Sequence, residues 1–120
     1  MRVLLAETDA ALAAELQHAF EANGGTVTAV SSSLAAWDLL AKDPPDLLVT
    51  RLAFGVGQVP GTALGAVASS KRIPVIYMPS DAARAADAHA EHGAVLIKPF
   101  SGAALVARAR ELLSTSKAKP

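Results

Sequence analysis

The chain has 120 residues, a length typical of one compact domain, and 52% of them are hydrophobic, which is enough to build a core. Eleven lysine and arginine residues balance eleven aspartate and glutamate residues, so net charge gives no electrostatic argument for binding nucleic acid or an anionic membrane surface. The absence of cysteine excludes disulfides, thiolate metal sites and cysteine nucleophiles.

Membrane and export signals are also missing from the sequence. No apolar run approaches the roughly 20 residues that a membrane-spanning helix needs. The apolar stretch at the N-terminus is too short for the core of a signal peptide, and acidic residues follow it at once. We therefore expect a soluble, cytoplasmic protein without a membrane partner.

Short apolar segments alternate along the chain with longer segments of helical periodicity. The apolar segments predict five strands, at 3–6, 26–30, 47–50, 74–78 and 95–97. Most of these strands are continuously apolar, which is typical of a parallel sheet that is covered on both faces. With right-handed crossovers, the pattern predicts a three-layer, doubly wound α/β domain over residues 1–113.

A helix is expected after each strand. The third and fourth are expected near 62–71 and over 81–92, and the last over about 102–113. A polar segment, 114–120, is expected to be an irregular tail or the start of a linker. The residues predicted to face the core from the first, second and last helices are Leu12, Leu16, Ala19 and Phe20; Leu34, Trp37, Leu40 and Ala41; and Leu105, Val106, Ala109, Leu112 and Leu113.

Polar residues follow the strands at the edge where open α/β sheets bind their ligands, which is the carboxyl end of the strands. We therefore expect two carboxylates and two cations to converge there. The residues directly after the first, third, fourth and fifth strands are Glu7, Thr8 and Asp9; Arg51; Pro79 and Ser80; and Lys98 and Pro99.

Four segments, VLLAETDAAL, PDLLVTRL, IPVIYMPSDA and HGAVLIKPF, resemble in order and spacing the CheY-like receiver domain of two-component response regulators. The resemblance covers roughly residues 1–113. It implies a flavodoxin-like fold with a parallel five-stranded sheet of order 2-1-3-4-5. It also implies phosphotransfer from a histidine kinase to an aspartate that ends the third strand, beside Mg²⁺ held by two acids after the first strand.

Half of the family's pocket pattern is absent from this chain. Glu7 and Lys98 match their positions, whereas Thr8 replaces the second acid, Arg51 the phosphoacceptor, and Pro79 the Thr or Ser after the fourth strand. The resemblance also implies a cis peptide bond between Lys98 and Pro99. The predicted site is therefore a degenerate phosphorylation pocket, made of Glu7, Thr8, Asp9, Arg51, Pro79, Ser80 and Lys98.

Arg51 is incompatible with phosphotransfer and Mg²⁺ binding at its position, because a guanidinium is neither a nucleophile nor a metal ligand. Two unit charges about 4 Å apart interact by about 4 kcal/mol at an effective dielectric near 20, and a divalent ion would be repelled about twice as strongly. We therefore predict that the protein is not an enzyme, has no catalytic residue, needs no cofactor and binds Mg²⁺ weakly or not at all.

The Arg51 side chain has two possible environments. Its fork can pair bidentately with Glu7 or Asp9 while Lys98 takes the remaining carboxylate, which would give a neutral internal cluster. Alternatively, the guanidinium reaches out of the loop into solvent.

Two other patterns offer weaker sites. The glycine-rich loop 55–61 follows a strand and precedes a helix, as a phosphate-binding loop does, but the first strand–helix turn has no glycine. His89 and His92 are three residues apart on a predicted helix and could hold a metal, although histidines in a last helical turn are commonly solvated.

These observations predict a pseudo-receiver, a signalling module of a phosphorelay system that is not phosphorylated on aspartate and acts by protein–protein interaction. The expected partner is a histidine kinase, an output protein or a second copy, bound by the face of the fourth helix, fifth strand and fifth helix that the family uses; no nucleic acid is expected. One alternative is an authentic phosphoreceiver whose acceptor is Thr8, Asp9 or Ser80. The other is a flavodoxin-like binder of a small molecule or nucleotide at the loop 55–61.

Overall fold

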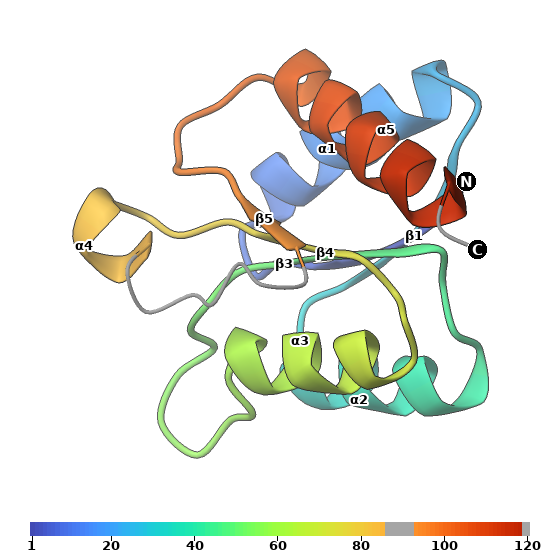
Figure 1. The fold of residues 1–120 in the computed structure, drawn as a ribbon. Coiled ribbons are helices and arrows are strands. Elements are labelled where there is room, and N and C mark those ends of the chain that lie inside the picture. The colour runs from blue at the N-terminus through green and yellow to red at the C-terminus, as the bar shows by residue number, and fades with distance from the viewer. Residues whose placement is uncertain (86–92, 119–120) are drawn as a thin grey trace.

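A five-stranded parallel sheet of order β2-β1-β3-β4-β5 forms the centre of the computed structural model, which describes residues 1–85 and 93–118 (Figure 1). The order confirms the predicted topology. The strands are β1 (Arg2–Ala6), β2 (Thr26–Val30), β3 (Leu47–Thr50), β4 (Val75–Tyr77) and β5 (Gly93–Val95). Because β1 and β3 lie in the interior of the sheet, the residues that follow them meet near the middle of its carboxyl edge.

Helices cover both faces of the sheet, as predicted. Figure 1 shows α1 and α5 on one face and α2 and α3 on the other. The helices are α1 (Ala10–Ala22), α2 (Ser33–Lys42), α3 (Gly61–Ser70), the single turn α4 (Ala82–Ala85) and α5 (Gly102–Ala118). The predicted helix 81–92 is therefore described only in its first turn, and its remainder, with His89 and His92, lies outside the described residues.

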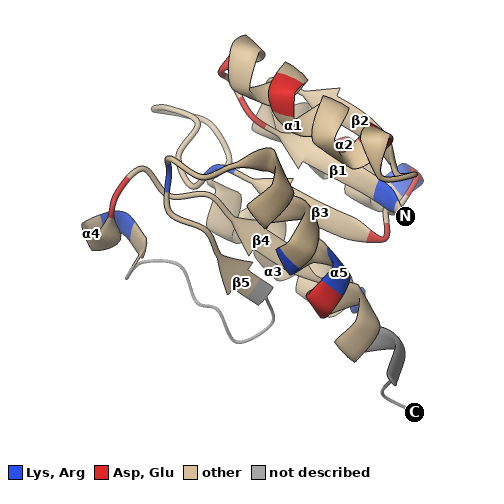
Figure 2. Cartoon of the chain, turned by 90° about the horizontal axis from the view of Figure 1, so that it is seen from above, with Lys and Arg blue, Asp and Glu red and all other residues tan. Residues whose placement is uncertain are grey.

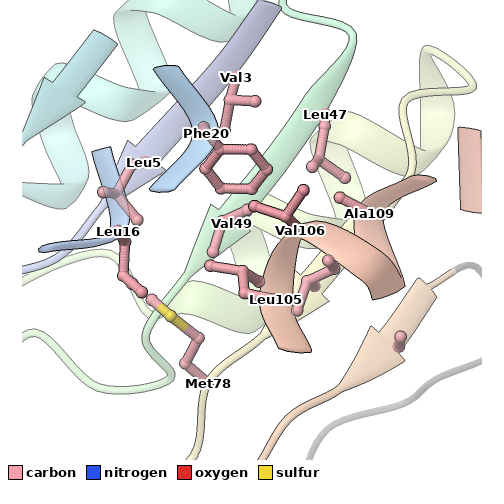
Figure 3. Packing of buried hydrophobic residues seen from close by; sticks show 12 residues of the cluster. Val3, Leu5, Leu16, Phe20, Leu47, Val49, Met78, Leu105, Val106 and Ala109 are labelled. Carbon is pink, nitrogen blue, oxygen red and sulfur yellow. The ribbon is translucent and has the colours of Figure 1, made fainter. Parts of the chain in front are cut away.

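The core is split by the sheet into two layers. Alternate strand residues point to opposite faces, so Leu5 and Val49 belong to the α1/α5 layer and Leu4 and Leu48 to the α2/α3 layer. Figure 3 shows Phe20 of α1 packed among strand and α5 side chains in the first layer. All four residues of β3 are buried, which accounts for the unbroken apolar run in the sequence.

The inward face of α2 differs from the prediction. Leu40 is buried as predicted, but Leu34 is 60% exposed and Trp37 is 40% exposed. The helix turns the neighbouring stripe, Ser33, Ala36 and Leu40, toward the sheet instead. Two of these residues, Ser33 and Ala36, are small, and small residues let a helix approach a sheet closely. The predicted residues Leu34 and Trp37 each come one position later in the sequence and have the same helical spacing, so periodicity alone does not distinguish the two faces.

The last strand begins earlier than predicted. The predicted span 95–97 is replaced by Gly93–Val95, and Gly93 pairs with Val75. The ladder continues beyond the strand, because the N–H of Leu96 donates to the Tyr77 carbonyl (2.9 Å) and that of Lys98 to the Pro79 carbonyl (2.9 Å). This pairing brings Lys98 to the carboxyl edge of the sheet.

The last helix is longer than predicted. Residues 114–118, expected in an irregular tail, belong to α5, which ends at Ala118. The segment contains no Gly or Pro before Pro120 that would stop the helix, and the hydroxyl of Thr115 donates to the Glu111 carbonyl (3.0 Å). Across the described part of the chain, no helix has the length and apolar character needed to cross a bilayer.

Candidate functional site at the carboxyl edge of the sheet

Glu7 is a fully buried carboxylate at the end of β1. Its own N–H donates to the Val30 carbonyl (3.1 Å), which continues the pairing of β1 with β2. Its side chain has no exposed surface, and its Oε1 accepts a hydrogen bond from Lys98 Nζ (2.6 Å). Its Oε2 accepts from the N–H of Asp9 (2.9 Å) and from Arg51 Nη1 (3.2 Å). Three donors therefore satisfy one buried charge, as such a charge requires.

The pKa of Glu7 reflects opposing influences. Burial raises this pKa, but the Asp9 N–H, the hydrogen bond and charge of Lys98, and the charge of Arg51 together outweigh burial and hold the pKa below its ordinary value. Glu7 is therefore a carboxylate at neutral pH and a poor source of protons.

Arg51 lies between Glu7 and the β3–α3 loop. Its N–H donates to the Ala6 carbonyl (3.1 Å), so its backbone still belongs to the sheet. Its Nη1 donates to Glu7 Oε2 and to Thr8 Oγ1, and its Cζ lies 6.0 Å from the centre of the Phe54 ring. Its buried Nε has no hydrogen-bond partner in the described structure.

The structure decides between the two environments predicted for Arg51. Its carboxylate partner is Glu7, and the side chain, 28% exposed, is not simply solvated. The bidentate pairing is wrong, because Glu7 Oε1 is occupied by Lys98 and Oε2 is shared with the Asp9 N–H.

Asp9 does not join the cations as predicted. It is the N-cap of α1, and its Oδ1 accepts from the N–H of Leu12 (3.1 Å). The prediction of a neutral cluster is therefore wrong, since one carboxylate faces two cations and the local charge is positive. The sequence held a signal for this role, because Asp is a preferred N-cap residue directly before a helical segment such as AALAAEL.

A glycine fixes the backbone of Arg51. Gly61 begins α3, and its N–H donates to the Leu52 carbonyl (2.7 Å). A Cβ atom on Gly61 would clash with the Arg51 carbonyl oxygen, so no other residue allows this approach without a shift of the backbone. The other two glycines of the loop 55–61, Gly55 and Gly57, have positive φ, a backbone conformation that glycine adopts freely.

The remaining predicted residues line a small pocket next to the ion cluster of Glu7, Arg51 and Lys98. The pocket has a volume of about 180 Å³, and Pro79, Ser80 and Lys98 contribute to it together with Arg51 and Arg84. Arg84 and Phe54 are the neighbours that the sequence analysis missed. Arg84 belongs to the single turn α4, and its N–H donates to Oδ1 of Asp81, which directly precedes that turn (2.8 Å). Figure 2 shows basic colouring on α4.

The residues at this edge do not fit a magnesium ion. Mg²⁺ requires near-octahedral oxygen coordination. Glu7 contributes the only carboxylate that contacts the cations among the described residues, and nitrogen donors occupy both of its oxygens. In addition, the described residues contain no group of three or more potential metal-ligating side chains. The Lys98–Pro99 peptide bond is cis, as the resemblance implies.

Comparisons with known proteins identify the fold. No family model and no curated protein matches the chain. The structure is similar to a response regulator receiver protein from Sinorhizobium medicae WSM419, with a TM-score of 0.87, 28% identity, and coverage of 97% of this chain and 96% of that chain.

Two further solved structures are similar. The receiver domain of the Francisella response regulator 1452 has a TM-score of 0.82 and 22% identity, with 96% of this chain and 98% of that chain covered. The signal receiver domain of a signal transduction histidine kinase from Syntrophus aciditrophicus has a TM-score of 0.82 and 24% identity, with 99% and 94% covered. The predicted receiver fold is confirmed over nearly the whole chain.

Proposed function

We propose that this chain, which has the receiver-domain fold of two-component signalling, is a pseudo-receiver. It is not phosphorylated on aspartate, has no enzymatic activity and acts in the cytoplasm by binding other proteins. The observation that carries the proposal is Arg51. It directly follows β3, where the resemblance places the phosphorylated aspartate, and it pairs with the buried Glu7.

The oxygen nucleophiles near Arg51 have other roles. Thr8 Oγ1 accepts a hydrogen bond from Arg51, and the Asp9 carboxylate caps α1. Ser80 lines the pocket. The carboxylate of the ion cluster, Glu7, is a weak base with a lowered pKa and is held by three donors, and Asp81, which follows Ser80, accepts the N–H of Arg84. Among residues 1–85 and 93–118, these carboxylates are therefore engaged by other donors and do not serve to activate a hydroxyl as an alternative acceptor.

Arg51 acts in this proposal as an internal cation in place of the metal. Together with Lys98 it neutralises Glu7 permanently, so the pocket keeps one charge state without Mg²⁺ or phosphate. A receiver fixed in this way signals through its partners, a histidine kinase, an output protein or a second copy. In the resemblance these bind the face of α4, β5 and α5.

The test compares amide NMR spectra of the protein with and without Mg²⁺ and beryllofluoride, which mimics a phosphoryl group. We expect no saturable shift near Glu7 and Lys98 in the natural sequence. We expect the double variant Thr8→Asp/Arg51→Asp, which restores two carboxylates at these positions, to show such shifts. Arg51→Gln is the matched control, because it removes the cation without adding a ligand, and it should remain silent.

Saturable Mg²⁺-dependent shifts around Glu7 and Lys98 in the unmodified chain would refute the proposal and favour an authentic phosphoreceiver. Shifts confined to 54–62 on addition of a nucleotide would favour the small-molecule binder instead.

A further inference from the structure

A pocket of about 880 Å³ lies at the amino-terminal edge of the sheet, at the opposite end from Glu7. The starts of β1, β3 and β4 border it, together with the connection from α3 to β4 and the C-terminal half of α5. Figure 1 shows that the N-terminus, the α3–β4 connection and the end of α5 lie on the same side of the molecule. The volume falls in the range of small-molecule sites, roughly 300–1,000 Å³.

Three cations line this pocket, namely Lys71, Arg72 and Arg110. The ion pairs found within residues 1–85 and 93–118 include none of them. Arg110 Nη2 donates to an uncharged partner, the amide oxygen of Asn23 (3.1 Å). One carboxylate, Asp46, also lines the pocket, and its Oδ2 accepts from the backbone N–H of Arg2 (2.7 Å). The pocket is therefore positively charged.

The rest of the lining is largely apolar. Met1, Ile73 and Leu113 line the pocket from the residue before β1, the α3–β4 connection and α5. Ile73 belongs to the core on the α2/α3 side and is only 7% exposed, so the small part of it that lines the pocket is held in place. A site with an apolar wall and a few convergent charges suits a ligand that has both an apolar and a charged part.

Arg72 occupies a backbone position that favours glycine. Its φ is +62°, and it is the first residue after the Lys71 C-cap of α3. The N–H of Arg72 donates to the Ser69 carbonyl (2.9 Å) and that of Ile73 to the Ala68 carbonyl (2.9 Å), as in the helix-ending motif that commonly has glycine here. A charged side chain at this costly position lines the pocket, which agrees with the tendency of backbone strain to occur at functional sites.

We propose that this pocket binds a small amphiphilic anion. Its carboxylate or phosphate head contacts Arg72, Lys71 and Arg110, and its apolar body packs against Ile73 and Leu113. The two head groups share the chemistry that guanidinium and ammonium groups recognise. The bound anion joins α5 to the α3–β4 connection. None of these residues belongs to the Glu7 site, so the proposal does not depend on the proposed function.

The test titrates the full chain with octanoate and, separately, with octyl phosphate, and follows amide NMR shifts. We expect saturable shifts at residues 71–74 and 110–114 for at least one of them, and the stronger binder identifies the preferred head group. Octanol, which lacks the charge, and inorganic phosphate, which lacks the apolar body, should each bind at least about tenfold more weakly. The proposal is overturned if neither anion saturates, or if octanol or inorganic phosphate binds as tightly as the anions.

The variant Arg72→Gly separates binding from folding. Glycine adopts positive φ freely, so the variant should unfold at a temperature no lower than that of the natural sequence, yet its affinity for the anion should fall about tenfold. Arg108→Gln is the control, because Arg108 lies on the same helix but pairs with Glu111 (2.8 Å) and does not line the pocket. Unchanged affinity in Arg72→Gly would contradict the proposal. So would self-association that perturbs the same residues without added anion, which would assign the pocket to a second copy.

Discussion

The two ends of the sheet hold the same kind of group in opposite environments. Glu7 at the carboxyl edge has no exposed side-chain surface and is held by two cations, whereas Asp46 at the amino edge is exposed and accepts from a backbone N–H. Removing a carboxylate from water is costly unless partners replace the lost hydration. Lys98 and Arg51 provide these partners for the buried Glu7. Asp46 keeps its hydration, and the cations of its pocket remain without ion pairs in the described structure.

The comparison predicts a large effect for the substitution Glu7→Gln. It leaves two neighbouring cations without a counter-charge in a mostly buried cluster, so we expect the free energy of unfolding to fall by about 3 kcal/mol. Urea denaturation at neutral pH measures the change. Glu111→Gln is the control, because it breaks an exposed ion pair and should cost less than about 1 kcal/mol. If the two substitutions lower the free energy of unfolding equally, the burial of Glu7 does not make its ion pairs more stabilising than the exposed pair.

A smaller effect is expected at the other end of the sheet. Asp46→Ala removes an exposed acceptor, and water replaces it at the N–H of Arg2. The free energy of unfolding should therefore fall by only about 0.5–1 kcal/mol in the same urea measurement. A loss as large as that of Glu7→Gln would show that the two ends are not energetically different.

The smallest expected effect is the pH dependence of stability that Glu7 causes. Burial raises the pKa of Glu7 while its hydrogen bonds and the nearby cations lower it, so the net lowering of this pKa is only the difference between them. The folded protein binds the Glu7 proton less tightly than the unfolded chain does. The stabilisation from this group is thus complete above its ordinary pKa and is lost as pH falls through the lower, folded pKa. The difference in unfolding free energy between the natural sequence and Glu7→Gln should shrink between about pH 6 and pH 3. Urea titrations across this range measure it, and a difference that stays constant or grows on acidification would contradict the assignment.

The fold could be predicted because each strand forms a short segment rich in apolar or β-branched residues, continuously buried in β3 and partly exposed in the edge strand β2. The runs at 26–30 and 47–50 coincide with β2 and β3. The orientation of α2 could not be predicted in the same way. Two adjacent stripes of that helix have equal spacing, and only contact with the sheet selects Ser33 and Ala36 over Leu34 and Trp37.

The sequence predicted which residues form the candidate site, but it predicted less well which of them contact each other. Glu7, Arg51 and Lys98 converge as predicted, because parallel strands bring their carboxyl ends to one edge. The cap formed by Asp9 is a local interaction that the sequence indicated. The sharing of Glu7 between both cations depends on side-chain positions from three strands, and no local pattern encodes that geometry.

The sequence by itself determined the alternation of strands and helices, the sheet order through its family resemblance, and the replacement of an acceptor aspartate by Arg51. These follow from periodicity and residue identity, which are properties of the chain read in order. The tertiary structure decided that Arg51 pairs with Glu7 and that Lys71, Arg72 and Arg110 meet around one pocket. Such contacts join residues far apart in the chain, and their partners are set by the packing of whole elements rather than by neighbouring residues.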